Sequence, residues 1–159
     1  MSRGKKRNPR NLMLDPVYGS VLISKFINMI MEDGKKEVAE KIVYSALKAS
    51  EIKIKEKYKQ SIAKGFYELI LSIGPTVMTK VRRIGGANYQ VPVELPEYRR
   101  IFVGMKILKK AAQKKSGIPM AKALANEILD AINEKGEAYK EKETIQKMAF
   151  ANKAYSHLA

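Results

Sequence analysis

Cysteine is absent from this chain of 159 residues, and histidine occurs once, at His157. Without cysteine there is no disulfide, thiolate nucleophile or cysteine-based metal site. A lone histidine near the end of a chain is typical of a surface residue, and metal sites normally need clustered ligands. Gly85 and Gly86 are not followed by the Lys-Ser/Thr pair of a nucleotide-binding loop, and no carboxylate has an apolar setting that would raise its pKa. We therefore expect no enzyme, no metal, no cofactor and no small-molecule substrate.

Long apolar runs are missing as well. None reaches the roughly 18 residues that a membrane-spanning helix needs. Residues 1–11 are polar and basic, so they lack the apolar region of a secretory signal peptide. We expect no membrane-spanning segment and no membrane partner.

Acidic residues are in short supply. The sequence has 16 Asp and Glu against 31 Lys and Arg, which leaves a net charge of +15. Such an excess of positive charge repels itself and is usually offset by a polyanionic partner. Nucleic acid is the first candidate for this partner, and an anionic membrane surface is the second. The cations are not confined to one short amphipathic helix, which disfavours the membrane surface. No helix-turn-helix or dimerising heptad pattern is present, which favours a folded RNA over a DNA duplex.

Residues 1–11 form a basic block with no acidic residue, and they are predicted to be a disordered N-terminal arm. Two interpretations remain open at this point. The block is either a solvated tail or an arm that becomes ordered along a phosphate backbone. Its candidate RNA-binding residues are Arg3, Lys5, Lys6, Arg7 and Arg10.

A β-hairpin is predicted at about residues 76–95. Apolar and polar residues alternate on both sides of Gly85 and Gly86, which tolerate the positive φ of a tight turn. Pro92 cannot donate a ladder hydrogen bond, so its strand is not central in a sheet. A two-stranded ribbon is marginal alone and must lean on the helices or on a partner. Arg82 and Arg83 beside the turn indicate that this partner is an anion.

Hydrophobic periodicity predicts a mainly α chain with a single domain over 12–159 and helices at about 20–32, 35–50, 60–73, 97–115, 119–134 and from 137 onward. The first helix has almost no polar face, which predicts a buried central helix. We expect Ser20 to cap it and Gly34 to end it. Val38 is predicted to face the core from the second helix. Residues 51–61 alternate charges with little apolar content, so we expect a loop or a frayed helix end.

The other candidate RNA-binding residues lie in three places. At the start of the second helix, Lys35 and Lys36 oppose the helix dipole, so they are either phosphate contacts or a solvated pair. Tyr89 either stacks on a base or packs on the inner face of the ribbon with Val91. The ribbon candidates are Lys80, Arg82, Arg83, Asn88, Tyr89 and Gln90. The fourth helix has a basic face without interleaved carboxylates, which predicts a nucleic-acid surface made of Arg99, Arg100, Lys106, Lys109, Lys110, Lys114 and Lys115.

At these residues the sequence resembles a known family, small-subunit ribosomal protein seven of the bacterial and organellar type. The resemblance covers about residues 12–157. Its most specific part is the ribbon block from Arg82 to Glu94, RRIGGANYQVPVE. Further matching points are Asp15-Pro16 to Ser20, Gly34-Lys35-Lys36 with Ile42-Val43 and Ala46, Met120-Ala121 with Leu124-Ala125, and Asn152-Lys153-Ala154 with His157.

The resemblance implies a bundle of about six helices with one protruding two-stranded β-hairpin. It implies a structural protein of the small ribosomal subunit that binds the 3′ major domain of 16S-type rRNA and nucleates assembly of the subunit head. Exit-site tRNA and mRNA would lie nearby, with ribosomal proteins nine and eleven as neighbours. The tRNA-proximal tip would be Arg82, Arg83, Gly85 and Gly86. The location would be a bacterial cytoplasm or an organelle, plastid or mitochondrion.

Two segments depart from the family pattern. Residues 51–61 are richer in lysine, and the chain from Tyr155 to Ala159 lacks a basic, aromatic tail. The alternative to a ribosomal protein is a free-standing RNA chaperone or DNA-binding protein that uses the same charge.

Overall fold

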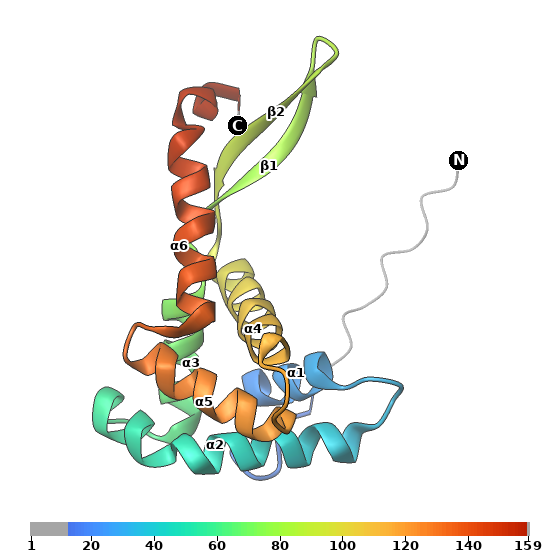
Figure 1. Cartoon of the computed structure of the whole chain (residues 1–159), viewed down its shortest axis with the longest axis vertical. Helices are drawn as coiled ribbons and strands as arrows, with labels where there is room; N and C mark the ends of the chain where they lie inside the picture. The colour runs from blue at the N-terminus through green and yellow to red at the C-terminus, as the bar shows by residue number, and fades with distance from the viewer. Residues whose placement is uncertain (1–12, 159) are drawn as a thin grey trace.

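The computed structural model describes residues 13–158, which form six α-helices, one β-hairpin and a short C-terminal 3₁₀ helix. Their order is α1 (Val21–Ile30), α2 (Lys36–Tyr58), α3 (Ile62–Ile73), β1 (Val77–Ile84), β2 (Ala87–Glu94), α4 (Glu97–Lys114), α5 (Met120–Ile132), α6 (Gly136–Ala151) and η1 (Lys153–Leu158). Figure 1 shows α1 to α5 gathered in one body, from which the hairpin and α6 project side by side. The predicted fold class, mainly α with one protruding hairpin, is confirmed.

The core lies where the amphipathic helices turn their apolar stripes inward. Ile62, Phe66, Leu69 and Ile73 are buried along α3, as their spacing predicts. The rings of Phe26 and Phe66 lie 5.4 Å apart between α1 and α3. The hydrophobic core of the helices therefore forms without residues of the ribbon.

Helix α1 differs from its prediction. Only one face is buried, with Ile23, Phe26, Ile27 and Ile30, while the opposite face is exposed. The prediction of a helix buried all round was wrong because α1 lies at the side of the bundle. The structure also differs from the prediction at both ends of α1.

Ser20 precedes α1 but makes no side-chain capping bond. The turn is held by buried Asp15, whose Oδ2 accepts hydrogen bonds from the backbone N–H groups of Val17 and Tyr18. The helix ends at Ile30, so Gly34, with φ of 73°, belongs to the following turn and does not end the helix.

Helix α2 is longer than predicted. It continues through residues 51–58 to Tyr58, so the prediction of a loop or frayed end was wrong there. Ile54 is fully buried against Gly65 of α3, and Tyr58 also packs against the core, so these two side chains anchor an otherwise charged segment. The prediction for Val38 was also wrong, since it is 53% exposed, and the neighbouring stripe through Ala39 and Val43 faces the core instead.

The hairpin forms as the sequence predicts. Ile84 pairs with Ala87 across a two-residue turn, in which Gly85 and Gly86 have φ of 56° and 88°. Two positive φ values in succession suit the right-handed twist of a ribbon and favour glycine at both positions. At the base of the ribbon Val91 is fully buried, while residues 80–88 are exposed. Within the described residues no helix is long and apolar enough to cross a membrane.

Candidate nucleic-acid interface

The two faces of the ribbon differ in what they present. Residues directly opposite one another in an antiparallel pair share a face. Arg82 pairs with Tyr89, and Lys80 pairs with Val91, so these side chains belong to one face. Val91 is buried there, and the ring of Tyr89 packs 5.4 Å from that of Tyr155 in η1. Of the two interpretations of Tyr89, packing on the inner face is the one that the structure contains.

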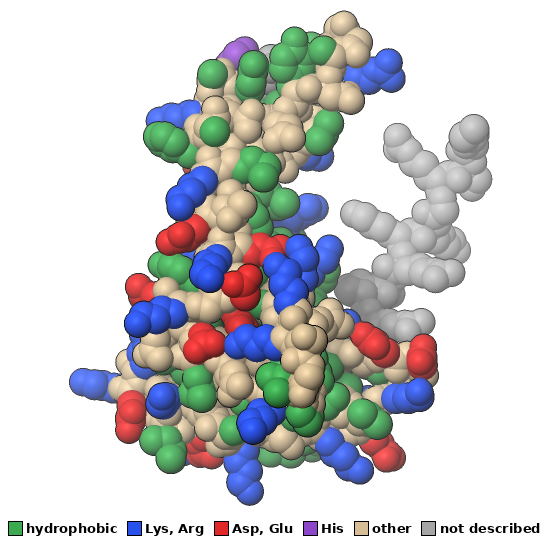
Figure 2. Space-filling view, in the orientation of Figure 1, with side chains coloured by type: hydrophobic (Ala, Val, Ile, Leu, Met, Phe, Trp, Pro, Cys, Tyr) green, Lys and Arg blue, Asp and Glu red, His purple; other side chains and the backbone are tan. Residues whose placement is uncertain are grey.

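The other face of the ribbon points away from this packing. It carries Arg83 paired with Asn88, and Val81 paired with Gln90, all of them exposed. No acidic residue occurs between Val77 and Val93, and Figure 2 shows no acidic side chain on the visible end of the ribbon. A cation and two amides on an exposed edge can bind phosphates and the hydrogen-bonding edges of bases together.

Several cations on the basic face of α4 already have partners within the protein, which its sequence did not indicate. Lys109 donates a hydrogen bond to the carbonyl of Met29 at 2.8 Å, and Arg100 donates one to the carbonyl of Leu71 at 3.2 Å. Lys110 reaches Glu141 of α6 at 2.6 Å. The expectation that these cations lack partners was wrong, because the partners come from other helices that the bundle brings alongside.

Glu141 is the centre of this pairing. It accepts from Lys110 at 2.6 Å and also lies 3.5 Å from the ammonium of Lys114. Burial alone would raise the pKa of Glu141, but the hydrogen bond and charge of Lys110, together with Lys114, outweigh it and hold the pKa below its ordinary value of 4.5. The carboxylate therefore stays ionised and neutralises part of the basic face.

Three cations of α4 have no carboxylate partner among the described residues, namely Arg99, Arg100 and Lys106. Arg100 is half-buried and donates to the carbonyl of Leu71, whereas Arg99 and Lys106 are exposed. Arg99 lies over the ring of Tyr98 at 6.0 Å and donates from Nε to its hydroxyl at 3.3 Å. Arg99 and Lys106, rather than the whole predicted set, are the exposed cations of α4 that a phosphate could bind without breaking an ion pair.

The remaining candidates fall outside this surface or outside the described residues. Lys35 lies 3.7 Å from Asp33, and Lys36 lies 3.6 Å from Glu40, so both take part in exposed ion pairs. Such pairs contribute little and can exchange for phosphates. The five basic candidates of residues 1–11 lie outside the described residues.

Exposed aromatic rings were missed by the sequence reasoning. Tyr98 and Phe102 are 68% and 56% exposed, and Phe150 of α6 is 75% exposed. Spacing alone did not predict the exposure of Tyr98, because it precedes Ile101 by three residues and Met105 by seven and so continues the core stripe of α4. Phe102, one turn further along, lies at the edge of that stripe. The exposure of Phe150 was likewise not predictable from spacing, because it depends on how α6 packs beside the ribbon.

The described residues contain no group of three or more His, Cys, Asp or Glu side chains that could hold a metal ion. What the structure presents is a basic helical bundle with an exposed, cationic β-ribbon. These features define a class of basic helical proteins whose surface suits a nucleic acid.

Comparison with known proteins gives the family. Residues 2–153 match the family described as "Ribosomal protein S7p/S5e". The small ribosomal subunit protein uS7 of Nitratiruptor sp. is 48% identical over 157 residues, which cover 96% of this chain and 97% of the relative. Those of Sulfurimonas denitrificans and Dictyoglomus thermophilum are 45% and 43% identical, and the matches cover 98% and 99% of this chain and 97% and 98% of the relatives.

The chain therefore belongs to the S7p/S5e family of ribosomal proteins, which confirms the resemblance read from the ribbon block. It is a family of structural ribosomal proteins and not of enzymes.

Proposed function

We propose that this chain is a primary rRNA-binding protein of a bacterial-type small ribosomal subunit, in a cytoplasm or an organelle. It binds the 3′ major domain of the 16S-type rRNA and nucleates assembly of the subunit head. Curated relatives with this full-length similarity are named small ribosomal subunit proteins, which supports the placement. Ribosomal proteins nine and eleven are its neighbours on this proposal.

The single observation that carries the RNA contact is the ribbon. Its tip from Lys80 to Asn88 is exposed and basic, and this segment contains no acidic residue. The ribbon packs on α6 and η1 through its inner face, where Val91 is buried and Tyr89 contacts Tyr155. Its tip extends beyond these contacts, so the tip is the part of the ribbon that an external partner would cover. On this proposal the tip, with Arg82, Arg83, Gly85 and Gly86, extends toward exit-site tRNA and mRNA, while the arm and α4 hold the rRNA.

Two measurements test the proposal. The purified chain should bind a transcript of the 3′ major domain with an affinity that falls steeply as salt rises, because each neutralised phosphate releases counterions. In cells the chain should remain near-stoichiometric with small subunits after a moderate salt wash. If it stays in the soluble fraction, the free-standing RNA chaperone or DNA-binding alternative takes its place.

A further inference from the structure

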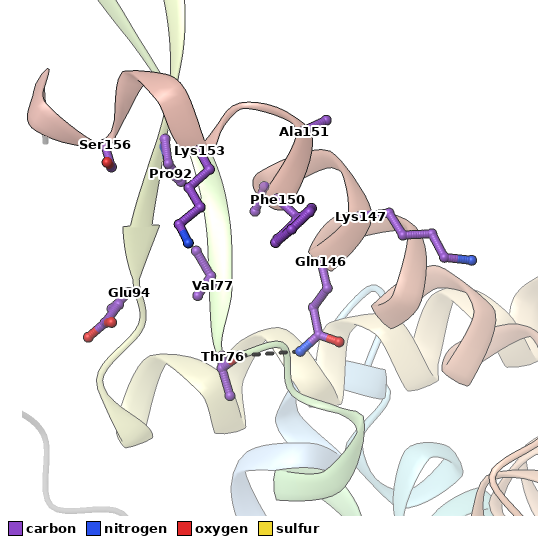
Figure 3. A pocket seen from close by; sticks show the side chains of 11 residues that line it. Thr76, Val77, Pro92, Glu94, Gln146, Lys147, Phe150, Ala151, Lys153 and Ser156 are labelled. Carbon is purple, nitrogen blue, oxygen red and sulfur yellow. Dashed lines mark hydrogen bonds between the residues drawn. The ribbon is translucent and has the colours of Figure 1, made fainter.

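A groove of about 670 Å³ lies between the base of the ribbon and the end of α6. Figure 3 shows Val77 and Pro92 on the ribbon side and Phe150 and Gln146 on the α6 side, with the side chain of Lys153 between the two walls. Its size falls within the roughly 300–1,000 Å³ of sites that hold small molecules. The groove is therefore large enough to hold a nucleotide-sized group.

Phe150 is the unusual feature of this groove. Its neighbour Ala149 is 3% exposed and packs inward, whereas Phe150 is 75% exposed on the wall. Single exposed apolar residues are common and need no explanation. Here, however, the ring stands in a concave site with an ammonium beside it, since Nζ of Lys153 lies 5.9 Å from the ring centroid.

The charge around the groove favours an anionic occupant. Lys153 has no carboxylate partner among the described residues, and Lys147 has only an exposed contact with Glu143 at 3.6 Å. Glu94 is the one acidic residue of the lining. The neighbouring ribbon has no acidic residue from Val77 to Val93.

A polar group completes the site. The side-chain amide of Gln146 donates to the hydroxyl of Thr76 at 3.3 Å, which fixes its position on the wall. Its carbonyl oxygen accepts no hydrogen bond from the described residues, so it is available to an amino group. A flat ring, an ammonium and an amide together match the face, phosphate and edge of an unstacked nucleotide.

We propose that this groove holds one unstacked base of a single-stranded RNA segment. The base stacks on Phe150, Lys153 binds the adjoining phosphate, and Gln146 contacts the edge of the base. The proposal rests on the proposed RNA-binding function and adds a position where the chain takes a base out of the RNA stack.

Affinity for the 3′ major domain transcript tests the stacking. Phe150→Ala should weaken binding by about 5- to 150-fold, the range for loss of one base–aromatic stack, and Phe150→Tyr should restore binding to within about 2-fold of the original chain. Ile52→Ala is the matched control, since Ile52 is 72% exposed on α2 and lies outside the groove. It should leave affinity within about 2-fold. Because Phe150 is exposed, its substitution should not alter the fold, and an unchanged circular dichroism spectrum checks this.

A fluorescent reporter tests the occupant. The chain has no tryptophan, so Phe150→Trp places the only one in the groove. Its emission should be quenched by the transcript but not by inorganic polyphosphate, which has the charge without the bases. The groove proposal is overturned if Phe150→Ala binds like the original chain, if the tryptophan is unchanged at saturating transcript, or if it is shielded only after other ribosomal proteins are added. Failure of the original chain to bind the transcript would instead overturn the proposed function.

Discussion

The ammonium of Lys115 lies 2.8 Å from Oε2 of Glu127, a side chain with no exposed surface. The other carboxylate oxygen of Glu127 accepts a hydrogen bond from the backbone N–H of Ala138 at 2.7 Å. Lys115 also donates to Asp130 at 3.0 Å. This pair therefore joins the end of α4 to α5 and to the first turn of α6. Burial lowers the pKa of Lys115, but the hydrogen bonds to Glu127 and Asp130 outweigh it, so its pKa is raised.

Replacing Lys115 with methionine should destabilise the fold by about 3 kcal/mol, because it leaves Glu127 as a buried charge without its cation. Urea unfolding measures the change in free energy. Lys122→Met is the control, since Lys122 is exposed on α5, and it should cost less than about 0.5 kcal/mol. Equal midpoints for the two variants would show that Lys115 is a surface cation like the others.

Glu141 should give the fold a defined pH dependence. Its folded pKa lies below the ordinary value of 4.5, so its stabilising effect is present above that value and is lost as pH falls through the folded pKa. At pH 7 the original chain should exceed Glu141→Gln in unfolding free energy by about 0.5–1 kcal/mol. The two should converge as pH falls below 4.5 and through the folded pKa, as measured by urea unfolding at each pH. A difference that stays constant across this range would exclude the ion pairs with Lys110 and Lys114 as its source.

The two exposed cations of α4 that have no carboxylate partner, Arg99 and Lys106, should supply the contribution of α4 to RNA affinity. Changing Arg99 and Lys106 together to glutamine should lower the slope of log affinity against log salt by about 1.4–1.8, at roughly 0.7–0.9 for each lost phosphate contact. The matched control changes Lys48 and Lys64, exposed cations of α2 and α3. A salt dependence of affinity equal to that of the control would show that α4 does not contact the RNA.

Contact between α2 and α3 leaves no room for a side chain at Gly65. A Cβ added there would lie 2.5 Å from Cγ2 of Ile54, so Gly65→Ala should cost about 1–3 kcal/mol in urea unfolding. Ile54→Leu removes the branch at Cβ and should recover part of that loss. Gly104→Ala is the contrast, because the clash at 2.5 Å is with the backbone carbonyl of Ile70, which no side-chain change can relieve. Failure of the Ile54 change to recover any stability would contradict this packing.

Local pattern predicted the secondary structure where one periodicity dominates. The spacing of Ile62, Phe66 and Leu69 gave α3, and alternation around Gly85 and Gly86 gave the hairpin with its turn. The same reasoning failed at residues 51–58, because the burial of Ile54 against Gly65 is a contact between segments that no local pattern contains.

The amino-acid sequence by itself determined the excess of positive charge, the absence of cysteine, the ribbon and the family. Tertiary structure alone decided which cations of α4 have a carboxylate partner. Lys110 appears unpaired along α4 but is neutralised by Glu141, which lies 31 residues further along the chain. The groove beside Phe150 likewise exists only because α6 lies beside the ribbon. Periodicity reports which way a side chain points on its own helix, whereas ion pairs and concave sites depend on distances between helices, which packing fixes.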